Sequence, residues 1–219
     1  MKKVLLLTGF TSILIGCNSN SNNNTGKHDS LDHAGHNVTN TKPKNQDNMN
    51  PVKATMDKMM HDMHGAKATG NNDVDFAAMM IEHHKGAVEM SKLELDKGNN
   101  AELKAFAQQV IGDQNKEIAF MQEFILKAAK TTSSNSSEFQ KALQQSMMVM
   151  MNDNTTIYND IDKDFAAQMI PHHQSAVDMA KAYLQYGQEK SLTTLCRNII
   201  NSQEKEINWL KEWLHKEKK

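Results

Sequence analysis

The chain has 219 residues and a formal net charge of −1, and its basic residues are spread among acidic ones. This balance leaves no basic patch, so nucleic acid is excluded as a partner. Only two cysteines are present, which excludes a framework of several disulfides.

The N-terminus has the pattern of a lipoprotein signal peptide. Lys2 and Lys3 precede an apolar run over residues 4–15, which ends at Gly16 and Cys17. The run is shorter than the roughly 20 residues that a membrane-spanning helix needs. We therefore predict a signal peptide over residues 1–17, lipidation of Cys17, and a lipid-anchored protein that faces the periplasm or the cell exterior. An ordinary secretory signal with an incidental cysteine is the alternative.

Residues 18–50 are rich in Asn, Ser, Thr and Lys and have almost no aliphatic side chains, which predicts a disordered tether. Its histidines, at positions 28, 33 and 36, are interpreted either as loose metal ligands or as incidental. Strong helix formers dominate residues 51–219, so this part is expected to be a single all-α domain. A short Met-rich helix is predicted over residues 52–64. There Met60, His61 and His64 are candidates for an additional metal site, because Met60 and His64 lie one turn apart.

An internal repeat organises this domain. Residues 75–84, DFAAMMIEHH, return as DFAAQMIPHH at 164–173, and the register then holds without a gap. The repeats span about 52–130 and 138–217. They predict long helices at 75–97, 101–128, 162–186 and 189–217, with Gly98 and Gly187 as C-terminal caps. A polar linker at 133–137 and a second Met-rich helix at 138–152 complete a pseudo-twofold helical bundle.

The repeated motif carries two neighbouring histidines, His83 and His84 in the first copy and His172 and His173 in the second. All four touch the core-facing stripe of their helix. Buried imidazoles cost desolvation unless both ring nitrogens find partners, and a metal ion satisfies one nitrogen while a neighbouring acceptor orients the other. One such histidine is usually structural, but a pair that recurs in both copies favours a metal site.

The type of metal follows from the neighbouring methionines. Met80 and Met169 each lie one helical turn before a histidine pair. Thioether and imidazole ligands together favour copper, Cu(I) in particular, with Cu(II) as the alternative. The competing interpretation is that these methionines only fill irregular gaps in the core.

The second helix of each copy places polar residues at core-facing positions: Gln114 and Glu117, repeated as Gln203 and Glu206. We interpret these four as hydrogen-bond partners of the histidines or as occasional ligands. A purely structural polar network is the alternative.

The pattern Phe-x-x-x-Met-Ile-x-His-His-x-x-Ala-Val-x-Met, followed by Gln-x-x-Glu-Ile on the next helix, resembles the bacterial exported proteins of the domain-of-unknown-function 305 family over approximately residues 52–217. This resemblance implies a ferritin-like four-helix bundle with two extra short Met-rich helices, and extracytoplasmic copper binding in copper tolerance. The ligands that it implies are Met80, His83, His84, Met90, Met169, His172, His173 and Met179. Pro171 departs from the first copy, which has Glu82, and is expected to kink its helix.

The leading hypothesis is a non-catalytic protein that sequesters copper or hands it on outside the cytoplasm. One alternative is a metal-dependent oxidase on a ferritin-like scaffold, although the Glu-x-x-His pattern of di-iron sites occurs only at Glu212 and His215. The other alternative is a metal-free, Met-rich interaction module. The sequence identifies no protein partner.

Overall fold

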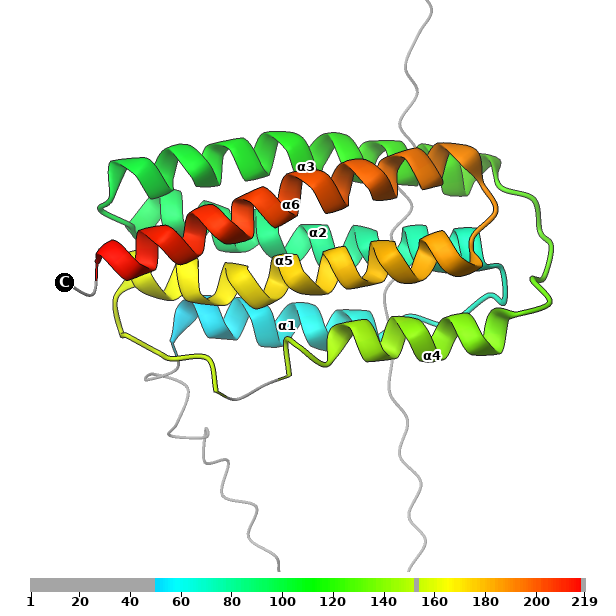
Figure 1. The fold of residues 1–219 in the computed structure, drawn as a ribbon, viewed down its shortest axis with the longest axis horizontal. Helices are drawn as coiled ribbons and strands as arrows, with labels where there is room; N and C mark the ends of the chain where they lie inside the picture. The colour runs from blue at the N-terminus through cyan, green and yellow to red at the C-terminus, as the bar shows by residue number, and fades with distance from the viewer. Residues whose placement is uncertain (1–49, 152–153, 218–219) are drawn as a thin grey trace, which may run out of the picture. The chain divides into compact units, whose positions relative to one another are not determined.

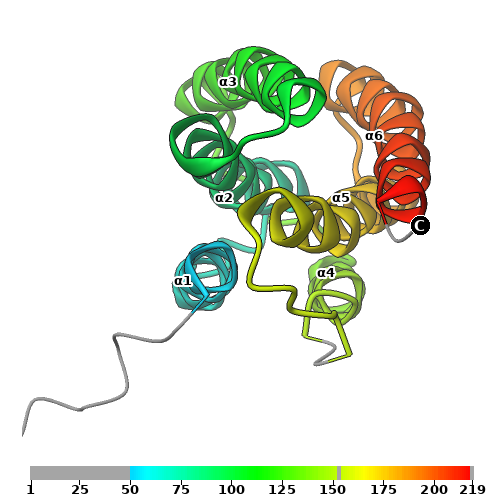
Figure 2. The same cartoon turned by 90° about the vertical axis from the view of Figure 1, so that its left-hand side faces the viewer.

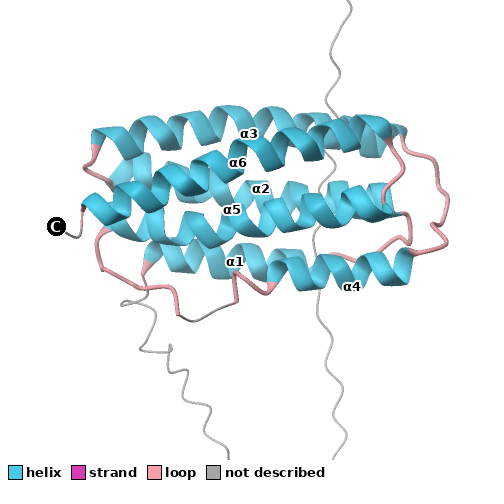
Figure 3. Ribbon diagram, in the orientation of Figure 1, coloured by secondary structure: helices cyan, strands magenta, loops and turns pink. Residues whose placement is uncertain are grey.

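The computed structural model describes residues 50–151 and 154–217, all of which belong to one compact unit. These residues form helices and no strands (Figure 3), which confirms the all-α prediction. The helices are α1 (Pro51–Gly65), α2 (Asn72–Lys97), α3 (Ala101–Lys127), α4 (Ser136–Met147), α5 (Ile161–Tyr186) and α6 (Lys190–Lys216). The predicted signal peptide, Cys17 and the tether histidines lie outside the described residues.

The six helices are arranged in three layers of two (Figures 1 and 2). The middle layer is formed by α2 and α5, which pack against each other. On one side of it, α3 packs on α2 and α6 packs on α5; on the other side lie the short helices α1 and α4. The repeat therefore produces a four-helix bundle with two additional helices. None of the helices that the structure describes is long and apolar enough to cross a membrane.

Asparagine side chains determine where three helices begin. Asn50, Asn71 and Asn100 each accept hydrogen bonds from two backbone N–H groups in the first turn that follows. Because of the cap at Asn71, α2 begins three residues before its predicted start at residue 75. Asn50 also donates to the carboxylate of Asp164 over 2.6 Å, so the folded unit includes the last residue of the predicted tether.

Gly98 and Gly187 follow the last residues of α2 and α5, as predicted, but for a different reason. Their φ angles are −69° and −81°, in the extended region rather than the left-handed one. A Cβ atom at Gly98 would clash with the side chain of Glu94, and one at Gly187 would clash with the ring of Tyr183. The glycines therefore make room for a side chain of the preceding turn.

Each hairpin is tied to the other copy by a carboxylate. Asp162 of α5 accepts hydrogen bonds of 2.9 Å from the backbone N–H groups of Asn99 and Asn100, in the loop of the first hairpin. Asp73 of α2 accepts in the same way from the loop of the second hairpin, at Gln188 and Glu189. Because each loop depends on the other copy, the two repeats stabilise each other.

The second half departs from the prediction at two places. The helix predicted over 138–152 is α4, which begins at Ser136, inside the predicted linker, and ends at Met147, with turns over residues 148–151. Met148 and Met151 are 64% and 60% exposed, so no packing supports a further helical turn there. Pro171 lies inside α5, which continues as one helix through it.

Candidate metal centre

The four repeated histidines meet at the centre of the bundle, across the contact between α2 and α5. All four side chains are 0% exposed. The rings of His83 and His172 lie closest, with centroids 3.8 Å apart and planes at 43°. His84 lies 6.2 Å from His83, and His173 lies 5.9 Å from His172. The imidazoles therefore form a continuous row, in the order His84, His83, His172, His173, which we call the histidine row.

A carboxylate from α3 or α6 stands at each end of the histidine row. His84 Nε2 donates a hydrogen bond of 2.7 Å to Glu117 Oε2. At the other end His173 Nε2 lies 2.9 Å from Glu206 Oε2, which is within ion-pair distance although the angles are not those of a hydrogen bond. Both carboxylates are partly exposed, 21% for Glu117 and 17% for Glu206. The row thus has negative charge at both ends, supplied by the same residue of each repeat.

For His84 and His172 the hydrogen bonds determine which ring nitrogen is free, whereas both nitrogens of His83 and of His173 lack a hydrogen-bond partner. A carboxylate or carbonyl oxygen can only accept, so the Nε2 atom that faces it carries the proton. This holds for His84, and for His172, whose Nε2 donates over 3.0 Å to the backbone carbonyl of His83. The Nδ1 atoms of all four histidines are buried without a hydrogen-bond partner. A neutral imidazole protonated at Nε2 offers a lone pair at Nδ1, which is a metal-binding atom.

Burial keeps the central pair neutral. The pKa of His83 is well below its usual 6.5, first because burial disfavours the charged form and then because of the neighbouring His172. The pKa of His172 is also well below 6.5, because of burial and then because of His173. Neutral imidazoles bind metal ions without first releasing a proton to solvent.

The methionines predicted as ligands belong to the same core. All four are 0% exposed, and they are Met80, Met90, Met169 and Met179. Met80 lies one turn from His83 and His84 on α2, and Met169 lies one turn from His172 and His173 on α5. Within residues 50–151 and 154–217, no three His, Cys, Asp or Glu side chains form a group suited to a metal ion. The buried thioethers are further soft donor atoms on the same two helices, α2 and α5.

The two glutamines predicted beside the site are also buried. Gln114 is 4% exposed and Gln203 is 3% exposed, and the Oε1 atom of each lacks a hydrogen-bond partner. Native proteins rarely leave a buried amide oxygen unsatisfied. Together with the four Nδ1 atoms, these oxygens make the centre of the bundle rich in unused acceptors.

Comparison with known proteins places this arrangement in a family. The model of the domain of unknown function DUF305 matches the chain twice, over residues 20–125 and 73–214. The chain belongs to this family. No curated protein matches the sequence.

Several solved structures are similar to this one. CopM in a Cu(I)-bound form is 31% identical, with a TM-score of 0.50, and the match covers 66% of this chain and 96% of that one. CopM in an Ag-bound form is also 31% identical, with a TM-score of 0.50 and coverage of 66% and 95%. A DUF305 protein from Streptomyces coelicolor is 22% identical, with a TM-score of 0.54 and coverage of 68% and 94%, and shows the shared fold.

The additional site predicted on α1 of this DUF305 protein lies apart from the histidine row. His61 and His64 are exposed, and His64 Nδ1 lies 2.7 Å from the backbone carbonyl of Met60. The methionine of α1 that packs closely on α2 is a different one. Met59 is 4% exposed and packs on Gly86, where a Cβ atom would clash with its side chain. The sulfur of Met59 therefore occupies the space that a side chain at residue 86 would fill, one turn along α2 from His83. In the sequence, the glycine at position 86 is the only sign of this contact.

Proposed function

We propose that this protein is an extracytoplasmic, lipid-anchored copper-binding protein that sequesters copper or hands it on. The observation that carries the proposal is the histidine row, in which four buried imidazoles present four Nδ1 atoms without partners. Burial of such atoms costs free energy, on the order of 1–3 kcal/mol for each unsatisfied polar group. A metal ion bound at Nδ1 would recover that cost.

The ligand types favour copper in its reduced state. Imidazole nitrogen and thioether sulfur suit Cu(I), and four buried methionines lie on the two helices that carry the row. CopM, which shares the fold at 31% identity, is known in Cu(I)-bound and Ag-bound forms. Both ions are soft and monovalent, as this set of ligands would select.

The negative charge at the ends of the histidine row also favours a cation such as Cu(I). A cation inside the bundle needs nearby negative charge, because burial of an unpaired charge is costly. Glu117 and Glu206 supply one carboxylate at each end of the row. We therefore expect one Cu(I) ion for each copy of the repeat, held by Nδ1 atoms and thioether sulfur.

Export and lipidation are part of this proposal and rest on the sequence. The charged start, the short apolar run and Cys17 support a lipoprotein signal, which would hold the domain at a membrane by its lipid. We further propose that the role is non-catalytic. The buried row is suited to storage or transfer of an ion, and nothing in its chemistry requires turnover of a substrate.

The proposal is tested by titration of Cu(I) into residues 18–219 against a competing chromogenic chelator. The variant in which His83, His84, His172 and His173 are changed to Ala should take up at least two ions fewer than the parent protein. The matched control changes the exposed histidines of α1, His61→Ala together with His64→Ala. We expect the control to retain full uptake.

A further variant separates loss of ligands from loss of fold. Met80→Leu together with Met169→Leu nearly conserves the volume of the core but removes two thioethers. Its helical circular dichroism should match the parent, while its affinity for Cu(I) falls. If the four-histidine variant takes up as much Cu(I) as the parent, the histidine row is structural and the proposal is wrong.

A further inference from the structure

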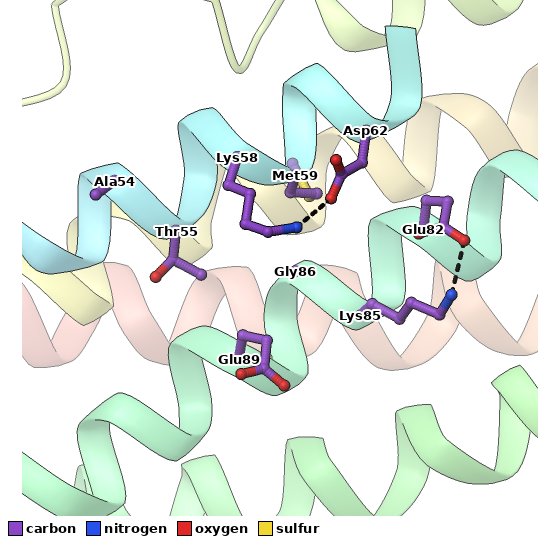
Figure 4. A pocket seen from close by; sticks show the side chains of 9 residues that line it. All are labelled: Ala54, Thr55, Lys58, Met59, Asp62, Glu82, Lys85, Gly86 and Glu89. Carbon is purple, nitrogen blue, oxygen red and sulfur yellow. Dashed lines mark hydrogen bonds and ion pairs between the residues drawn. The ribbon is translucent and has the colours of Figure 1, made fainter. Parts of the chain in front are cut away.

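Two of the hollows in the bundle, one beside α1 and one beside α6, differ in what they reach. The larger lies between α1 and α2 and has a volume of about 600 Å³ (Figure 4). Its floor is Met59 against Gly86, and its carboxylates are paired with lysines. Asp62 lies 2.5 Å from Lys58, and the two glutamates on α2, at positions 82 and 89, each lie 2.7 Å from a lysine. No residue of the histidine row lines it.

The smaller hollow is a crevice of about 370 Å³ between α3 and α6. It is lined by corresponding positions of the two repeats, and the pairs are Gln109 and Asn198, Asp113 and Ser202, Gln114 and Gln203, and Glu117 and Glu206. The crevice therefore lies on the pseudo-twofold axis, as the histidine row does. Figure 2 shows that α3 and α6 lie apart on the same side of the α2 and α5 layer.

Two features of the crevice are unexplained by packing. The Oε1 atoms of Gln114 and Gln203 have no partner although both side chains are more than nine-tenths buried. Glu117 and Glu206 line the crevice and also contact the outer rings of the histidine row, at 2.7 Å and 2.9 Å. The crevice thus joins solvent to the row through two amide oxygens and two carboxylates.

The charge of the crevice is negative where it meets the row. Its third carboxylate, Asp113, is paired with Lys116 at 2.9 Å. No lysine or arginine forms an ion pair with Glu117 or Glu206 among the described residues. A cleft with an excess of one charge raises the local concentration of the opposite ion and its rate of association.

We propose that the crevice between α3 and α6 is the route by which the cation reaches the histidine row, with Glu117 and Glu206 as the residues that receive it. Their carboxylates and the free amide oxygens replace water around the entering ion. The Nδ1 atoms and thioethers behind them bind it more tightly, because softer ligands suit a soft ion. This inference rests on the proposed copper-binding function and assigns its point of entry.

The test compares two pairs of substitutions that remove the same charge from different hollows. Glu117→Gln with Glu206→Gln alters the crevice and keeps an oxygen at residue 117 that can accept from His84. Glu82→Gln with Glu89→Gln alters the hollow between α1 and α2. The probe is Ag(I), a soft ion without redox chemistry, mixed rapidly with each protein. The readout is tryptophan fluorescence: of the two tryptophans, Trp209 stacks at 4.9 Å on Phe106, whose ring lies 6.4 Å from that of His173.

The crevice variant should take up Ag(I) at least about tenfold more slowly than the parent at ~10 mM salt. The difference should shrink at ~0.5 M salt, where screening removes the effect of charge but not that of altered packing. The variant of the hollow between α1 and α2, Glu82→Gln with Glu89→Gln, should match the parent at both salt concentrations. Slower uptake by that variant, or equal rates for all three proteins, would overturn the proposed route.

Equilibrium titration of the same proteins separates the two proposals. If the parent binds Ag(I) through its four central histidines while the crevice substitutions leave the rate unchanged, the entry route is wrong and the binding function stands. If the parent binds Ag(I) no better than the four-histidine variant, both the binding function and the entry route are wrong.

Discussion

Glu94, near the end of α2, provides a sharp test of the pseudo-twofold packing. It occupies the position that Tyr183 occupies in the second copy, and its side chain is 0% exposed. Tyr183 donates a 2.5 Å hydrogen bond to Asp73, whereas Glu94 lies beside the corresponding carboxylate, Asp162. Neither carboxyl oxygen of Glu94 accepts a hydrogen bond from the described residues. Glu94 can donate a hydrogen bond to Asp162, as Tyr183 does to Asp73, only when it is protonated.

The magnitude follows from the pKa. Burial, and then the hydrogen bond to Asp162 and its charge, raise the pKa of Glu94 from 4.5 to about 8; Asp160 acts in the same direction and Lys104 opposes it. The folded protein therefore holds a proton that the unfolded chain loses near pH 4.5. The stabilisation is complete below pH 4.5 and is lost as the pH rises through about 8. At ~1.4 kcal/mol for each pKa unit, the full effect is about 5 kcal/mol.

We expect Glu94→Gln to remove this dependence, because an amide cannot lose its proton but can still donate to Asp162. Urea denaturation, followed by circular dichroism between pH 4.5 and 9, gives the free energy of unfolding for both proteins. The parent should lose several kcal/mol relative to the variant as the pH rises. Glu102→Gln, an exposed substitution on α3, is the matched control. Parallel curves for the parent and Glu94→Gln would refute the reasoning.

Three further predictions concern packing. Gly86→Ala should lower the free energy of unfolding by about 1–3 kcal/mol, because the new Cβ would clash with Met59. Gly112→Ala, whose Cβ meets nothing within 4 Å, should raise that free energy by about 0.5–1 kcal/mol. Urea denaturation measures both, and equal effects would contradict the packing. Tyr183→Phe should lower the free energy of unfolding by about 1.5–3 kcal/mol, since it removes a hydrogen bond to a carboxylate; an unchanged value in urea denaturation would show that this bond adds no stability. The thiol of Cys196 should resist alkylation in the folded protein and react on unfolding, because burial raises its pKa; rapid labelling of the native protein, detected by mass spectrometry, would show that it is accessible.

The sequence predicted the long helices because their periodicity is strong and occurs twice. Predicted and observed ends of α3 and α5 agree within one residue. The boundary of α4 was wrong, since the Met-rich composition favours a helix but the packing needed for its last turn is absent. Local propensity carries no information about whether a partner surface exists.

Only part of the candidate site could be predicted from the sequence. Spacing put both histidines of each copy on the core-facing stripe, but it does not reveal which helix lies opposite. The contact between the rings of His83 and His172 depends on the packing of α2 against α5. The approach of Met59 to Gly86 and the crevice between α3 and α6 are likewise products of tertiary packing. The ligand roles of the histidines and methionines stay predictions from sequence and geometry together.

A crystal structure of residues 18–219 grown with Cu(I) under anaerobic conditions tests the central claim most directly. Anomalous scattering at the copper edge would locate each ion. The account predicts copper in the histidine row, within bonding distance of Nδ1 atoms and of buried thioether sulfurs, with Glu117 and Glu206 still on the Nε2 side of the outer rings. Copper found only at exposed positions, such as His61 and His64 of α1 or Met148 and Met151 after α4, would contradict it.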